Sequence, residues 1–140
     1  MKFETEYKAQ AKSDFMKLAK EFSAHVKRGD VILMYGNLGA GKTYFTNKLC
    51  ANLGVKTIVN SPSYILLNEY EGNVNVYHYD LYRLSAAHEV IDLGIIDRIP
   101  EGITIVEWPE LIEEYLPKRR YEIHFEHNGT KRNIKISHKE

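Results

Sequence analysis

Two kinds of apolar pattern alternate along the chain. Val31 to Tyr35 and Ile103 to Val106 are short, unbroken apolar runs, typical of strands buried on both faces of a parallel sheet. Two other segments repeat apolar residues at helical spacing. The first helix is predicted to begin at an N-cap at Ser13 and to end before Gly29, and the second to follow residue 41 and end near Gly54. The chain therefore alternates strands and helices.

Further segments predict strands that pair in antiparallel fashion. Phe3 to Tyr7 is polar enough to suit an edge strand. Tyr64 to Tyr70 and Val74 to Asp80 are predicted to pair across a turn at Gly72-Asn73. Apolar residues alternate between positions 121 and 136 on either side of an Asn-Gly turn, which predicts a C-terminal hairpin.

Two shorter helices complete the pattern. Ser85 is predicted to cap one that runs through Ile91, and Pro109 to begin another that Pro117 closes. Strands that alternate with helices, together with hairpins, predict a three-layer α/β fold with a mixed parallel and antiparallel sheet. The 140 residues suffice for a single domain, 1–140. In such folds ligands bind at the carboxyl ends of the parallel strands.

One loop in this pattern carries recognisable chemistry. Gly36-Asn37-Leu38-Gly39-Ala40-Gly41-Lys42-Thr43 matches G-x-x-x-x-G-K-[ST] and lies between a predicted strand and a predicted helix. Glycines let backbone N–H groups approach phosphate oxygens, and the helix N-terminus favours an anion. Lys42 would reach the β- and γ-phosphates, and the Thr43 hydroxyl would ligate Mg²⁺. The context favours a P-loop NTPase-like fold over the alternative, a glycine-rich turn with a surface lysine.

Two acidic residues are candidates for the other half of the site. Asp80 and Glu107 each end an apolar strand, at the edge of the sheet where the phosphate loop is expected. A carboxylate there can hold Mg²⁺ or polarise the attacking water, although each could instead cap a helix or turn. Ser61 and Ser63 lie where nucleotide hydrolases place a switch segment, or else form a simple turn. Trp108 is either a core residue or a lid over a nucleotide.

Charge, cysteine content and the length of apolar stretches limit the classes of protein to which the chain can belong. Nineteen basic and 19 acidic residues give no net charge and no reason to expect tight nucleic-acid binding by the chain alone. A single cysteine, Cys50, excludes an intramolecular disulfide. The sequence shows neither a transmembrane-length apolar stretch nor a signal-peptide core, so a cytoplasmic protein is expected. The six histidines lack metal-ligand spacing and are interpreted as structural or surface residues.

Four segments in this order resemble the TsaE (YjeE) family of P-loop ATPases, which act in tRNA threonylcarbamoyladenosine biosynthesis. Besides the phosphate loop they are Ser61-Pro62-Ser63-Tyr64, Tyr79-Asp80-Leu81-Tyr82-Arg83-Leu84 and Val106-Glu107-Trp108-Pro109-Glu110. The resemblance implies binding of ATP, ADP and Mg²⁺ and a weak ATPase activity. It also implies work with the TsaB and TsaD proteins, with tRNA met only through that complex.

The resemblance also assigns roles by position. It gives catalytic roles to Lys42, Asp80 and Glu107, metal binding to Thr43, Asp80 and Glu107, and the switch hydroxyl to Ser63. Nucleotide contacts are implied for Asn37, Leu38, Gly39, Ala40, Gly41, Lys42, Thr43, Tyr44, Ser63 and Trp108. Three positions depart from the family pattern, because Asn37 replaces Asp, Ser63 replaces Thr and Tyr44 replaces a second Thr. Tyr44 would then contribute only its backbone N–H to the α-phosphate.

Three other functions compete with this interpretation. A GTPase would need an Asn-Lys-x-Asp element, which the sequence lacks. A P-loop small-molecule kinase usually adds a substrate domain or an arginine-lined lid, for which 140 residues leave little room. A nucleotide-dependent scaffold that does not hydrolyse ATP differs only in whether turnover matters.

Overall fold

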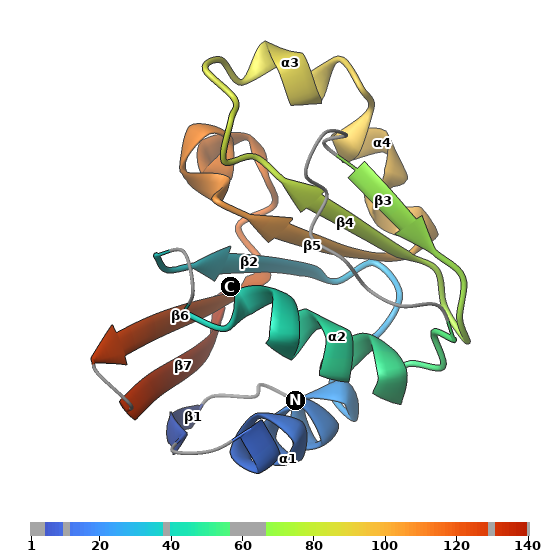
Figure 1. Ribbon diagram of the computed structural model, residues 1–140. Coiled ribbons are helices and arrows are strands. Elements are labelled where there is room, and N and C mark those ends of the chain that lie inside the picture. The colour runs from blue at the N-terminus through green and yellow to red at the C-terminus, as the bar shows by residue number, and fades with distance from the viewer. Residues whose placement is uncertain (1–4, 10–11, 38–39, 57–66, 129–130, 140) are drawn as a thin grey trace.

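The structure is a computed structural model that describes residues 5–9, 12–37, 40–56, 67–128 and 131–139 (Figure 1). Its strands are β1 (Thr5–Ala9), β2 (Val31–Tyr35), β3 (Leu67–Tyr70), β4 (Val76–Asp80), β5 (Ile103–Glu107), β6 (Arg120–Asn128) and β7 (Lys131–Lys139). Its α-helices are α1 (Lys12–Ser23), α2 (Lys42–Asn52), α3 (His88–Ile91) and α4 (Ile95–Arg98). Three 3₁₀ turns are η1 (Ile99–Glu101), η2 (Pro109–Leu111) and η3 (Glu113–Tyr115). In the part of the chain described, no helix is long and apolar enough to cross a membrane.

The strands form one seven-stranded sheet in the order β1-β7-β6-β2-β5-β4-β3. The four central strands, β6, β2, β5 and β4, run parallel to one another. The pairs β3–β4, β6–β7 and β1–β7 are antiparallel, so the sheet is mixed, as the sequence predicts. The carboxyl ends of β2, β5 and β4 consequently lie side by side at one edge of the parallel region.

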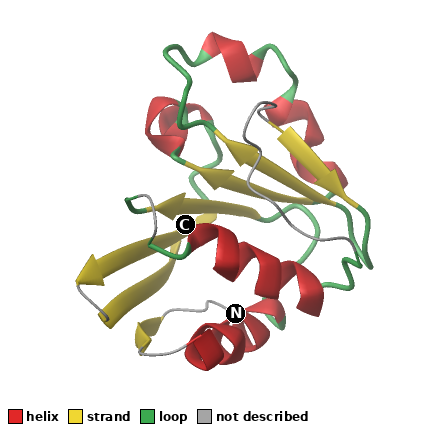
Figure 2. Cartoon of the chain, in the orientation of Figure 1, coloured by secondary structure: helices red, strands yellow, loops and turns green. Residues whose placement is uncertain are grey.

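The first face of the sheet is covered by α1 and α2, which lie next to each other in Figures 1 and 2. Alternate strand residues point to this face, among them Ile32 and Met34 of β2 and Ile105 of β5. They pack against Phe22 of α1 and Phe45 of α2, both completely buried. This packing fixes α2, the helix that follows the phosphate loop, against the centre of the sheet.

The second face carries the shorter helices and turns. Val31 and Leu33 of β2 point to this face and belong to a second buried cluster. That cluster includes Val90 of α3, Ile95 of α4 and Ile112 between η2 and η3. With a helical layer on each side of the sheet, the three-layer α/β prediction is confirmed.

Several predicted boundaries near the N-terminus and the sheet edge are wrong. The first strand extends to Ala9 instead of ending at Tyr7. Because α1 already includes Lys12, Ser13 lies within the helix and is not its N-cap. Helix and strand ends fray, and their limits commonly differ by one or two residues from those that a local pattern predicts. The predicted segment from Tyr64 is described only from residue 67, where β3 begins.

Two predicted helices also differ from the structure. Ser85 does not cap α3, because the helix begins only at His88 and the Ser85 hydroxyl donates instead to Glu89 Oε1. After Pro109 the chain forms two 3₁₀ turns and no α-helix. Ile112, between them, has φ −123° and ψ 0°, which interrupts helical geometry while its side chain enters the core.

Candidate functional site

The described ends of the phosphate loop are shaped by two glycines. Gly36 follows β2 with φ +148°, and Gly41 precedes α2 with φ +104°. A Cβ atom on Gly36 would lie 2.7 Å from the backbone oxygen of Phe125 in β6, and one on Gly41 would lie 2.5 Å from the ring of Phe15 in α1. Both positions therefore favour glycine for its conformation, and at Gly36, where backbone atoms of Phe125 lie in the way, for space as well.

Lys42, the first residue of α2, places its ammonium group inside this turn. The side chain is nearly buried, and its Nζ donates to the backbone oxygen of Gly36 at 2.6 Å. The same Nζ lies 3.8 Å from the ring centroid of Trp108, a cation–π contact. Burial lowers the pKa of Lys42, while the carboxylates of Glu107, Asp80 and Glu110 act in the opposite direction.

The two predicted acids are brought together beside this lysine. Asp80 at the end of β4 pairs in register with Glu107 at the end of β5. Strand alternation puts both on the face covered by α2, since Ile105 and Val76 belong to that core. Asp80 Oδ1 also accepts a hydrogen bond from the backbone N–H of Tyr82 at 3.1 Å, so this carboxylate caps a turn as well.

Glu107 has a buried partner that the sequence did not reveal. Its Oε2 lies 2.6 Å from Nε2 of His78, and both side chains are almost inaccessible to solvent. From the sequence alone, the histidines are interpreted only as structural or surface residues. Because 29 positions separate the two residues, their contact depends on the β4–β5 pairing and leaves no local sequence signal.

Trp108 adopts an unusual conformation next to the lysine. Among the described residues other than glycine it alone has positive φ, with φ 56° and ψ 57°. Its backbone N–H donates to the oxygen of Met34 in β2 at 3.3 Å. The ring of Tyr82, half exposed, packs on the indole with centroids 4.8 Å apart. Trp108 is thus partly packed against the second core and partly placed over Lys42.

The other predicted nucleotide-binding residues have diverse environments. Asn37 is exposed, whereas Ala40, whose N–H donates to the Asn37 oxygen, is buried. Thr43 is half-buried in the first turn of α2. The ring of Tyr44 packs near that of Phe15, with centroids 5.9 Å apart. Leu38, Gly39, Ser61 and Ser63 lie outside the described residues.

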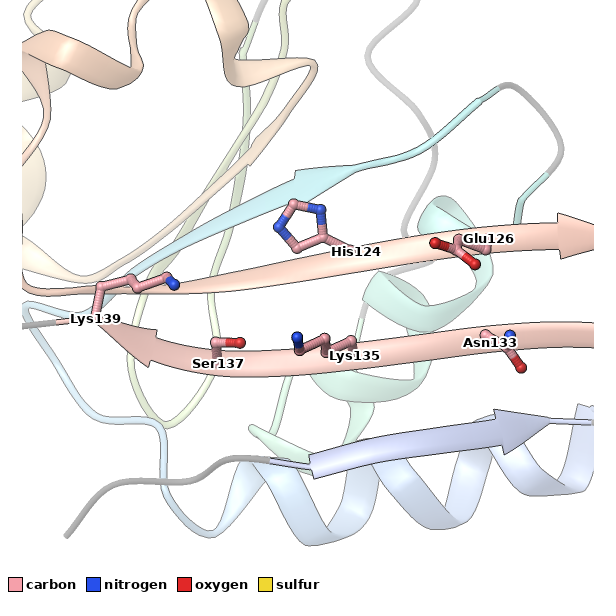
Figure 3. Close-up of a pocket in the computed structure, with 6 residues that line it drawn as sticks. All are labelled: His124, Glu126, Asn133, Lys135, Ser137 and Lys139. Carbon is pink, nitrogen blue, oxygen red and sulfur yellow. The ribbon is translucent and has the colours of Figure 1, made fainter.

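A second polar feature lies on the β6–β7 hairpin, on the face opposite the α1–α2 core. Six side chains from these two strands line a shallow hollow there (Figure 3): His124, Glu126, Asn133, Lys135, Ser137 and Lys139. The ring of Tyr35 stacks on His124 with centroids 4.6 Å apart. Burial and a hydrogen bond to Glu113 raise the pKa of Tyr35. The hollow combines both signs of charge on exposed side chains, and none of the predicted site residues lines it.

Within the described ranges, no three His, Cys, Asp or Glu side chains are grouped so that they alone could hold a metal ion. Thr43, Asp80 and Glu107 offer one hydroxyl and two carboxylates near the loop. Mg²⁺ is commonly bound by one or two carboxylates together with substrate phosphates and water. The donor set therefore fits a metal that arrives with a nucleotide better than a resident ion.

The strand–loop–helix path and the acids on neighbouring strands define a P-loop fold. A family model described as "Threonylcarbamoyl adenosine biosynthesis protein TsaE" matches residues 9–134. The chain therefore belongs to the TsaE family.

Individual proteins of this family are also similar to this chain in sequence and in structure. The tRNA threonylcarbamoyladenosine biosynthesis protein TsaE of Bacillus subtilis is 44% identical over 108 residues, which cover 76% of this chain and 67% of the relative. The protein of the same name from Rickettsia prowazekii is 31% identical over 132 residues, covering 93% of this chain and 92% of the relative. The crystal structure of Bacillus subtilis YdiB superimposes with a TM-score of 0.80 at 30% identity, covering 100% of this chain and 88% of that one.

Proposed function

We propose that this chain binds ATP with Mg²⁺, hydrolyses it slowly, and acts in the cytoplasm as an accessory subunit with the TsaB and TsaD proteins. The proposed outcome is the threonylcarbamoyladenosine modification of tRNA, the pathway that the names of its relatives state. The single observation that carries the proposal is the convergence of Lys42, Asp80 and Glu107 at the phosphate loop. One cation for phosphates and two carboxylates for metal and water are the groups that P-loop hydrolases need.

The state of Lys42 supports binding of an anion at this point. Its ammonium is nearly buried, and burial lowers its pKa, so a negatively charged ligand would restore the interactions lost from water. In the structure described here the ammonium is engaged by the Gly36 carbonyl and the Trp108 indole. Binding of ATP would exchange these two contacts for β- and γ-phosphate oxygens, which form stronger, charge-assisted hydrogen bonds.

The metal would neutralise charge that develops on the transferred phosphoryl group. Thr43, in the first turn of α2, would supply a hydroxyl ligand to it. Asp80 and Glu107 would hold the metal or orient the attacking water from the neighbouring strand ends. The backbone N–H groups at the start of α2 would face the phosphates, because the first turn of a helix leaves them without intrahelical partners.

A protein partner fits the exposed side of this arrangement. The ring of Tyr82 is half exposed, it packs on Trp108, and Trp108 lies over Lys42. A partner that moves Tyr82 could therefore alter how the indole covers the lysine. We propose that TsaB and TsaD contact the turn after β4 that contains Tyr82. The zero net charge of the chain agrees with tRNA binding through the complex and not directly.

The proposal is tested with Lys42→Ala and a matched control, Lys48→Ala. Both substitutions remove one lysine from α2, but Lys48 contacts the ring of Tyr44 at 5.2 Å and has no role in the proposed site. Loss of a hydrogen bond to a charged group costs about 1.5–3 kcal/mol, so ATP affinity should fall at least about tenfold in Lys42→Ala. Lys48→Ala should bind ATP as the unaltered chain does.

Calorimetric titration with ATP and Mg²⁺ measures the affinities, and circular dichroism checks that both variants are folded. Turnover of ATP is then measured with and without purified TsaB and TsaD. Equal ATP affinity in Lys42→Ala and Lys48→Ala would contradict the phosphate-loop assignment. Rapid turnover that is indifferent to the two partner proteins would contradict the accessory role.

A further inference from the structure

His78 is a completely buried polar residue within the parallel part of the sheet. It lies on β4 two positions before Asp80, so both side chains point to the face covered by α2. One ring nitrogen, Nε2, contacts Glu107 Oε2 at 2.6 Å. The other, Nδ1, lies 3.2 Å from the hydroxyl of Tyr70 in β3.

The hydrogen-bond directions follow from the chemistry of these groups. An ionised carboxylate can only accept, so Nε2 of His78 carries the proton that is donated to Glu107. In neutral histidine Nδ1 then accepts from the Tyr70 hydroxyl, whose oxygen in turn accepts from Nδ2 of Asn68 at 3.3 Å. A continuous chain of donors thus runs from the edge strand β3 to the carboxylate of Glu107.

We propose that His78 is a positioning residue that holds the Glu107 carboxylate in the orientation required for ATP hydrolysis. This inference rests on the proposed function, because it assigns a purpose to Glu107 that only a hydrolase needs. His78 itself touches neither nucleotide nor metal in this scheme. It acts through one oxygen of Glu107 and leaves the other for a metal ion or a water molecule.

The charge on Lys42 explains why such a restraint is needed. The Glu107 carboxylate is close enough to raise the pKa of Lys42, so the two opposite charges attract each other. Without another partner, a carboxylate at the end of β5 would turn toward the ammonium and leave the position of the water or metal. His78 binds the carboxylate from the neighbouring strand with a short hydrogen bond. Carboxylates that bind a metal ion are commonly held in place by such a second hydrogen bond.

A purely structural role is the competing explanation, since buried polar groups need partners in any protein. The two roles differ in what the side chain must supply. Structural packing requires a residue of suitable size, whereas positioning requires a donor at the place of Nε2. Glutamine can place its amide nitrogen near that point, while leucine fills a similar volume and has no donor.

The experiment compares His78→Leu, His78→Gln and Glu107→Gln with the unaltered chain. Turnover at saturating ATP and Mg²⁺ is measured with TsaB and TsaD present, ATP affinity is measured by calorimetry, and all assays run below the Tm of each variant. We expect His78→Leu to lower kcat about 10- to 100-fold, the usual effect of losing such a supporting contact. ATP affinity should change by less than about threefold, and His78→Gln should recover most of kcat.

The outcomes separate this inference from the proposed function. Slow turnover in Glu107→Gln with normal turnover in His78→Leu would overturn the role of His78 alone. His78→Gln as slow as His78→Leu would likewise overturn it, because a restored donor would then bring no benefit. Normal turnover in Glu107→Gln would remove Glu107 from the proposed mechanism, and the positioning role would fall with it.

Discussion

Replacing Gly36 with alanine introduces a Cβ atom where β2 leaves the sheet and the phosphate loop begins. That atom would lie 2.7 Å from the backbone oxygen and 3.0 Å from the Cβ of Phe125 in β6. Neither atom is the end of a flexible side chain, so relief requires the loop or β6 to shift. Residue 36 also has φ +148°, a conformation that side chains other than glycine rarely adopt.

The expected loss of unfolding free energy in Gly36→Ala follows from these two effects, backbone conformation and close contact. An unfavourable backbone conformation costs about 1–3 kcal/mol, and overpacking against a rigid neighbour adds about 1–3 kcal/mol. Gly29 provides a matched control, because it has φ +91° and a Cβ added there meets nothing within 4 Å. We therefore expect Gly36→Ala to lose about 2–6 kcal/mol of unfolding free energy and Gly29→Ala only the conformational part.

Urea unfolding followed by far-UV circular dichroism measures both variants against the unaltered chain. A typical domain has about 5–15 kcal/mol of stability, so a small loss shifts the urea midpoint of Gly36→Ala, and a loss near the full stability appears as a chain that is already unfolded without urea. ATP affinity provides a second measurement, since displacing Gly36 also displaces the carbonyl that holds Lys42. If Gly36→Ala is no less stable than Gly29→Ala, the close contact between the loop and β6 does not exist as described.

Two further predictions concern single reporter residues. Trp108 fluorescence should change on titration with ATP or ADP, because the indole lies 3.8 Å from the Lys42 ammonium; an unchanged spectrum at calorimetrically confirmed saturation would refute this. Burial raises the pKa of the Cys50 thiol to about 12, so the folded chain should react slowly with a thiol reagent at pH 8–9 and quickly in urea. Since the unfolded thiol ionises first, its contribution makes stability fall as pH rises above about 8.5, a trend that Cys50→Ala should reduce.

The central layers of the fold were predictable because their signals are local. The unbroken apolar run of β2 and the glycine motif after it each fit within a few residues, and the structure has a strand before the motif and a helix after it, as predicted. The C-terminal hairpin was likewise recognisable from alternation on either side of its turn. What the sequence did not indicate is that β6 would pair with β2 and so pack against Gly36. That neighbour comes from elsewhere in the chain.

In the candidate site, too, local patterns could be recognised in the sequence, whereas contacts between distant segments could not. Lys42, Asp80 and Glu107 could be proposed from the sequence because each follows a loop or ends a strand with a recognisable pattern, and the structure brings the three residues close together. The His78–Glu107 contact was missed because it arises only from the register of β4 on β5. The helix predicted after Pro109 does not form, for a related reason. Ile112 turns into the second core, and its backbone departs from helical geometry there.

The end of β5 connects the two halves of the site through consecutive residues. Glu107 points toward His78 on β4, and Trp108 turns back over Lys42 on α2. This reversal requires the left-handed conformation of Trp108, which costs about 1–2 kcal/mol for a residue with a side chain. The cation–π contact contributes about 1–2 kcal/mol in a desolvated setting, and packing against Tyr82 adds to it. Since these amounts nearly balance, a ligand that draws Lys42 away from the indole would also remove one of the contacts that hold Trp108 in this conformation. Nucleotide binding at the loop and the backbone next to Glu107 should therefore be coupled.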